Sequence, residues 1–202
     1  MSTVVEDGTT AASTPAQFTV VGRILHWLTA ILVFSGLIIG FVMVNSLADY
    51  ATLLRIHETV GATILVVVVV RLINRITHRP PTLPATVGRV ERLMVVGSEM
   101  AMYALLLAQP LIGWAMVSAS GTPVLVFGAI PVPSIAPANL ALFSALRETH
   151  SVFAYLLVVV IAAHVSAVLL HTITLRDGML RRMTFPLRSS HEQSRISGRA
   201  RG

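Results

Sequence analysis

Long apolar segments dominate the chain, and short polar segments separate them. Four apolar segments, residues 21–44, 56–73, 93–119 and 149–175, are long enough to cross a bilayer. A hydrocarbon core of about 30 Å requires about 20 apolar residues in a helix. The backbone must pair internally in lipid, and these segments do not alternate as barrel strands do. We therefore predict an all-α membrane protein, a four-transmembrane-helix bundle.

The remaining segments predict two tails and one short helix. Residues 1–17 are rich in Ser, Thr and Ala, and residues 186–202 are rich in Arg and Ser, so we expect both to be disordered. The bundle domain then covers residues 18–185. Residues 139–146 are apolar but too short to span the membrane, and Asn139 is a typical helix start. We expect a separate short helix here, which lies on the membrane or caps the bundle.

The composition supports a membrane protein and excludes several other classes. Of the 202 residues, 54% are hydrophobic and 12% charged, about half the charged fraction of a soluble domain. Because there is no cysteine, disulfides, thiolate metal sites and iron–sulfur clusters are excluded. The net charge is +6, but a basic nucleic-acid-binding domain would not be this apolar. We therefore expect membrane lipid as a partner and no nucleic acid.

The basic residues predict the orientation of the bundle. The chain has no lysine, and its 15 basic residues are all arginine. Thirteen precede the first predicted helix, surround the loop between the second and third, or follow the fourth. The opposite side carries only Arg55 and Arg147. Because positive charge is retained on the cytoplasmic side, we predict that both termini are cytoplasmic.

Five of the seven histidines lie in or beside the predicted spans, where ionisable side chains are rare and usually functional. These are His26, His57, His150, His164 and His171. The other two, His78 and His191, fall in arginine-rich segments and are interpreted as surface residues. His150 and His164 are 14 residues apart, which is close to four helical turns and a rise of about 21 Å. They therefore share one face of the fourth helix at two depths.

The predicted depths match in two pairs. His26 and His164 lie in the cytoplasmic half, and His57 and His150 lie in the outer half. Two imidazoles that face each other from different helices can ligate both faces of a haem iron, and bundle cores are common places for such sites. We therefore predict two haem groups, one held by each pair.

Small residues follow three of these histidines by four positions, and they would leave room for the face of a porphyrin. They are Ala30, Gly61 and Ala154. The alternative is that the histidines join helices by hydrogen bonds in a haem-free transporter or structural bundle. A zinc protease is excluded, because the segment that starts His57-Glu58 has Gly61 where the second zinc ligand would stand.

Three further polar residues are candidates for binding. His171 either reaches the membrane surface as an interfacial residue or donates a hydrogen bond to a quinone carbonyl or a haem propionate. Arg55 and Arg147 lie beside the two outer histidines. We expect them to pair with haem propionates or to attract an anionic electron donor.

From residue 17 to residue 185 the sequence resembles the bacterial four-helix cytochrome b561 family, close to the di-haem b subunits of hydrogenases and formate dehydrogenases. The matching segments include Arg-Ile-Leu-His-Trp at 23–27, Ile-His-Glu-Thr-Val-Gly at 56–61, residues 103–114, Glu-Thr-His at 148–150, Ala-His at 163–164 and residues 177–183. Their order and spacing carry the resemblance more than any single motif.

The resemblance implies a membrane oxidoreductase with two b haems, ligated by His26, His164, His57 and His150. It implies electron transfer across the bacterial inner membrane, from an outer donor such as superoxide to ubiquinone or menaquinone. His171 matches a histidine associated with the quinone site. The alternative within the resemblance is a cytochrome b anchor subunit that takes electrons from a redox partner protein, such as a dehydrogenase or hydrogenase.

One position departs from the family pattern. Four residues before Tyr103 the family often has histidine, and this chain has Glu99. Glu99 lies about two turns inside the third predicted helix, so we expect it to pair with an arginine of the second helix, Arg71 or Arg75.

Overall fold

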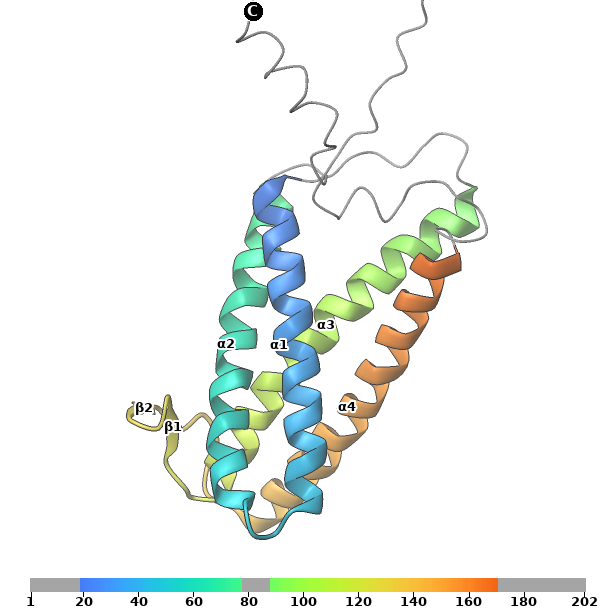
Figure 1. Cartoon of the computed structure of the whole chain (residues 1–202). Helices are drawn as coiled ribbons and strands as arrows, with labels where there is room; N and C mark the ends of the chain where they lie inside the picture. Colours follow the sequence, from blue (N-terminus) through green and yellow to red (C-terminus); the bar gives the residue numbers. More distant parts are fainter. Residues whose placement is uncertain (1–18, 78–87, 171–202) are drawn as a thin grey trace, which may run out of the picture.

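Four long helices make up the bundle (Figure 1). The computed structural model describes residues 19–77 and 88–170. The helices are α1 (Val20–Asn45), α2 (Tyr50–Thr77), α3 (Arg89–Ala119) and α4 (Leu140–Leu169). Each contains an apolar stretch long enough to cross a membrane. The predicted all-α fold with four spanning helices is confirmed.

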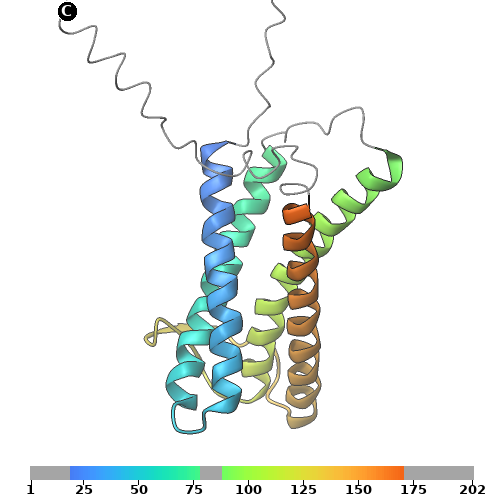
Figure 2. The same cartoon turned by 45° about the vertical axis from the view of Figure 1, so that its right-hand side comes forward.

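The helices run alternately up and down and pack as two pairs (Figure 2). α1 packs along α2, α3 packs along α4, and α2 also packs against α3, whereas α1 and α4 have no comparable contact. Every helix contributes to a small central core of Val33, Val68, Tyr103, Leu106 and Leu157. Most other large apolar side chains face outwards, as expected where lipid rather than water surrounds the bundle.

Two helices are longer than the sequence pattern suggested. α2 begins at Tyr50, before the expected residue 56, and continues to Thr77. α4 begins at Leu140, where the side chain of Asn139 accepts a hydrogen bond of 2.9 Å from the backbone of Leu142. The separate short helix expected over residues 139–146 is therefore wrong, because these residues are the first turns of α4.

Several predicted features lie outside the described residues. They are both tails, residues 171–175 of the fourth predicted span, and His78, His171 and His191. The orientation of the bundle in the membrane stays a prediction from the arginine distribution.

A β-hairpin between α3 and α4 was not anticipated. Strand β1 (Val124–Val126) pairs antiparallel with β2 (Ile130–Val132). Residues 127–129 connect the paired residues Val126 and Ile130. Phe127 and Gly128 are the central residues of a turn closed by a hydrogen bond of 3.3 Å from Ala129 N–H to the carbonyl of Val126, and their φ angles are 54° and 70°. Positive φ at both positions is the geometry of the type I′ turn, which matches the twist of a hairpin.

The hairpin is attached to two helices. The backbone N–H of Phe127 donates to Oγ1 of Thr59 on α2 at 3.0 Å, and the indole of Trp114 on α3 donates to the carbonyl of Pro133 at 3.0 Å. We call this end of the bundle, which also contains the α1–α2 loop, the hairpin end. The other end, where α1 begins, is the opposite end.

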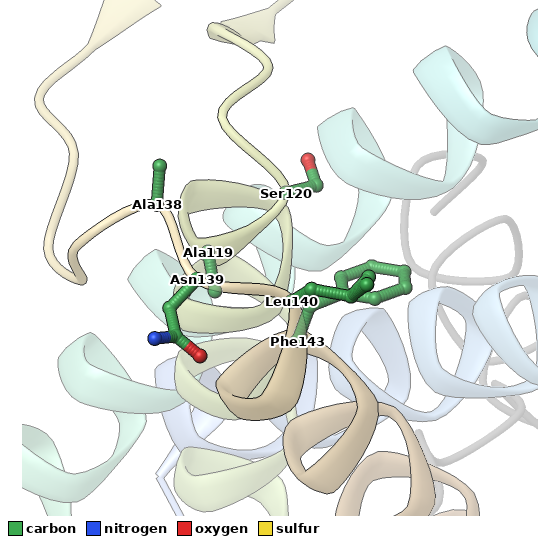
Figure 3. A pocket seen from close by; sticks show the side chains of 6 residues that line it. All are labelled: Ala119, Ser120, Ala138, Asn139, Leu140 and Phe143. Carbon is green, nitrogen blue, oxygen red and sulfur yellow. The ribbon is translucent and has the colours of Figure 1, made fainter.

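A cavity of about 340 Å³ lies at the hairpin end, where α3 stops and α4 starts (Figure 3). It is lined by Ala119, Ser120, Ala138, Asn139, Leu140 and Phe143. The backbone N–H of Asn139 donates to the carbonyl of Ala119 at 2.9 Å and holds the two helix ends together. The side chains that line the cavity are apolar apart from those of Ser120 and Asn139, and none of them is titratable.

Candidate functional site

The structure brings His57 of α2 and His150 of α4 together towards the hairpin end. Their ring centres are 6.2 Å apart, and the ring planes are inclined by 79°. The Nδ1 atom of each ring is buried and has no completed hydrogen bond. Buried polar atoms in proteins normally have partners, so two such atoms in one contact point to a functional role.

The two other helices approach these rings through glycines. A Cβ atom built on Gly40 of α1 would lie 3.2 Å from Cε1 of His57, and one built on Gly113 of α3 would lie 3.1 Å from Cε1 of His150. All four helices therefore meet around the histidine pair. These two glycines could not be identified from the sequence, because the close approach of two helices depends on packing that local spacing does not encode.

Gln109 on α3 fixes the backbone of α4 at this level. Its Nε2 atom donates to the carbonyl of His150 at 3.0 Å, while its Oε1 atom is buried without a partner. Gly61, one turn after His57, borders open space, since a Cβ atom there would meet nothing within 4 Å. At this level of the bundle, the backbone of His150 is therefore held by Gln109, and the face of α2 at Gly61 has no neighbouring atom.

Towards the opposite end, an arginine contacts His26. The Nη2 atom of Arg71 on α2 lies 3.0 Å from Nδ1 of His26, and its guanidinium lies 5.4 Å from the centre of the Tyr103 ring. Both His26 and His164 are within electrostatic reach of Arg71. A guanidinium only donates hydrogen bonds, so Nδ1 of His26 accepts in this arrangement.

Glu99 is paired, as expected, and its partner is Arg75. Nε and Nη2 of Arg75 donate to the two carboxylate oxygens of Glu99 at 2.7 and 2.9 Å. This two-point ion pair joins α2 to α3 towards the opposite end. Since both carboxylate oxygens accept hydrogen bonds from Arg75, the pairing favours a structural role over proton transfer.

The two arginines expected near the outer histidines lie close to them along the chain. Arg55 precedes His57 by two residues on α2, and Arg147 precedes His150 by three residues on α4; both are exposed. Neither forms a salt bridge in the part of the chain that the structure describes. They add two positive charges to the hairpin end.

The His57–His150 geometry would suit a metal-centred cofactor held by both imidazoles. An imidazole nitrogen binds a transition metal at about 2 Å, and rings whose centres are 6.2 Å apart would leave room for one such ion between them. Within the described ranges, no group of three or more His, Asp or Glu side chains gathers to hold an ion. Two histidines, open space beside Gly61 and a bundle interior therefore suit a haem, whose macrocycle supplies the other four ligands.

Four membrane-spanning helices with histidines paired across the bundle are typical of membrane cytochromes of the b type. A comparison with known families agrees, because the family model for prokaryotic cytochrome b561 matches residues 17–186. The chain belongs to this family. It is therefore a multi-pass protein of the bacterial inner membrane that binds haem b and takes part in electron transfer.

Two curated relatives extend the comparison. Over 174 residues the chain is 29% identical to cytochrome b561 homolog 2 of Escherichia coli (strain K12), covering 85% of this chain and 93% of the relative. Over 129 residues it is 33% identical to the probable superoxide oxidase CybB of Yersinia pestis, covering 63% of this chain and 72% of the relative.

Proposed function

We propose that the chain is a di-haem cytochrome that carries electrons from a donor at the hairpin end to a quinone in the membrane. His57 and His150 hold one haem b, and His26 and His164 hold the other. The observation that carries this proposal is the 6.2 Å separation of the His57 and His150 rings. The two histidines of α4 are 14 residues apart, which separates the two levels by about 21 Å along the helix.

The histidines define what the sites can do. When bound, haem b supplies reversible one-electron chemistry at its iron. Two histidines per site leave no open coordination position, so the residues favour electron transfer over oxygen binding. The protein contributes the ligands, their spacing and the surrounding charge.

The proposed donor is superoxide. The relative from Yersinia pestis is described as a probable superoxide oxidase, and superoxide is an anion that has to lose only one electron. The exposed Arg55 and Arg147 place guanidinium groups near the outer histidines in sequence, among the carboxylates of Asp49, Glu58 and Glu148, and each guanidinium would attract such a donor locally. In the orientation that the arginine distribution predicts, this end faces the outside of the cell.

The proposed acceptor is ubiquinone or menaquinone at the opposite end. Two superoxide ions lose one electron each to give two molecules of oxygen, and the quinone gains these two electrons and two protons to become the quinol. His171, seven residues beyond His164, is the candidate hydrogen-bond donor to a quinone carbonyl, although it lies outside the described residues.

The first test is haem quantitation on detergent-purified protein. We expect two b haems per chain by pyridine haemochrome, falling towards one in both His26→Ala and His57→Ala. His78→Ala is the control, since it is expected to lie on the surface and to keep both haems. Purified protein without haem, made with ample haem supply, would contradict the proposal and favour histidines that only join helices.

The second test is activity. Superoxide generated enzymatically should drive quinone reduction by the wild-type protein alone, with two superoxide ions consumed per quinol. A protein that holds two haems but is active only when a dehydrogenase or hydrogenase copurifies with it would be an anchor subunit instead.

A further inference from the structure

His57 and His150 contact the helix backbones of α1 and α3 in the same way. At Gly40 a Cβ atom would lie 3.2 Å from Cε1 and 3.6 Å from Nδ1 of His57. At Gly113 the corresponding distances to His150 are 3.1 and 3.5 Å. Both histidines therefore present the Cε1–Nδ1 edge of the ring to a glycine of a neighbouring helix.

The contact also repeats one turn earlier on each helix. The ring of His57 interacts with the backbone of Gly36, four residues before Gly40. The ring of His150 interacts with the backbone of Gln109, four residues before Gly113. Residues four apart lie on one face of a helix, so each ring lies against one face of the neighbouring helix, at the position where a glycine has no side chain.

This arrangement determines which ring nitrogen of His57 and of His150 is available to bind a metal. With the Nδ1 edge against the backbone, the Nδ1–H group faces helix carbonyls, and Nε2 keeps its lone pair for a metal. Metal-ligating histidines generally donate the other ring N–H to a carbonyl or carboxylate, which fixes the tautomer and the ring orientation. Nδ1 of each ring is buried and has no completed hydrogen bond.

We infer that Gly40 and Gly113 are positioning residues for the haem site at the hairpin end. By admitting the Cε1–Nδ1 edge of each ring, they fix Nε2 of His57 and of His150 as the iron-binding atom. This inference rests on the proposed function, because it concerns how the proposed ligands are held.

The other helix glycines of the described residues do not share this property. Gly61 and Gly97 have nothing within 4 Å of a built Cβ atom, and Gly36 meets only Ile64 and Val60, at 3.4 and 3.5 Å. Gly97 is in α3, the same helix as Gly113. It therefore provides a matched control, in which alanine adds a methyl group without touching a histidine.

The test compares Gly40→Ala, Gly113→Ala and their double variant with Gly97→Ala in the full-length, haem-loaded protein. Electron paramagnetic resonance of the ferric protein reports the ligand field of each haem, and His57→Ala identifies the signal of the hairpin-end haem. We expect this signal alone to shift in each single variant. In the double variant, haem content should fall from two towards one per chain.

The signal of the haem at His26 and His164 reports on folding in the same samples. If it is retained while the other shifts, the bundle is intact and the glycines act locally. Equal loss of both haems would assign the glycines to general helix packing and overturn the inference. Signals identical to those of Gly97→Ala would overturn it too. A wild-type protein that holds no haem would instead contradict the proposed function itself.

Discussion

The Nη2 atom of Arg71 lies 3.0 Å from Nδ1 of His26, and the same guanidinium lies over the ring of Tyr103. No carboxylate pairs with Arg71 among the described residues. The two histidine levels therefore differ in charge. His26 and His164 share their surroundings with a cation, whereas the rings of His57 and His150 lie against glycines.

Replacing Arg71 should lower the midpoint potential of the haem proposed at His26 and His164. A nearby cation disfavours the ferric form, which carries one more positive charge than the ferrous form. In Arg71→Met we expect a decrease of roughly 60 mV, which is a tenfold change in a one-electron equilibrium. Arg71→Lys keeps the charge and should shift the potential less. A redox titration followed at the haem absorbance measures the midpoint potential of both variants. Equal midpoint potentials in Arg71→Met and Arg71→Lys would rule out an effect of the charge.

The ion pair between Arg75 and Glu99 should make a measurable contribution to stability. In both views the first turns of α3 lean away from α1 (Figure 1, Figure 2), so this pair joins α3 to α2 where the bundle is open. Each side chain is one-third exposed, so we expect Glu99→Gln to cost about 1 kcal/mol.

The double variant Arg75→Gln/Glu99→Gln should cost less than the sum of the two single variants, because each single variant leaves one group unpaired. Thermal unfolding in detergent, monitored by circular dichroism, measures the stability of the wild type, the two single variants and the double variant. Additive effects would show that the two groups are not coupled.

The hairpin turn should be improved by substitution of Phe127. Its φ of 54° is unfavourable for a bulky residue, while asparagine adopts this region readily before glycine. Phe127→Asn should stabilise the hairpin by about 1 kcal/mol. Hydrogen exchange of the amides of β1 and β2 measures this, with Phe127→Leu as the control. Faster exchange in the Asn variant would indicate that the exposed Phe127 ring stabilises the hairpin through contacts with lipid.

Arg55 and Arg147 should affect the rate of electron entry rather than haem binding. The variant Arg55→Gln/Arg147→Gln should reduce the second-order rate constant for superoxide several-fold at low ionic strength, since it removes an attractive field. At about 1 M salt the difference from wild type should largely disappear, because charges are screened within about 3 Å. Stopped-flow reduction measures the rates. Loss of haem from the variant would instead assign these arginines to the propionates.

The sequence predicts much of this fold because lipid requires each spanning segment to be apolar and to satisfy its own backbone hydrogen bonds. Four apolar segments became four helices, and Asn139 caps a helix as its residue type indicates. The break expected after residue 146 did not occur. The charged Arg147 and Glu148 follow the short apolar segment 139–146, yet both are exposed on the surface of a continuous α4.

The parts that could not be predicted depend on contacts between helices. Gly40 and His57 are 17 residues apart and lie on different helices, so no local periodicity connects them. The contact of Arg71 with His26 has the same origin. The hairpin was missed because its strands have three residues each and β2 contains Pro131, which argues against a strand interior.

The location of the histidines also constrains the order of biogenesis. His26 and His57 lie on α1 and α2, whereas both potential partners, His150 and His164, lie on α4. Neither pair can close until the last helix has entered the membrane. A nascent or truncated chain that ends before α4 therefore has only half of each pair, and the proposed haem sites can assemble only after α4 has been made.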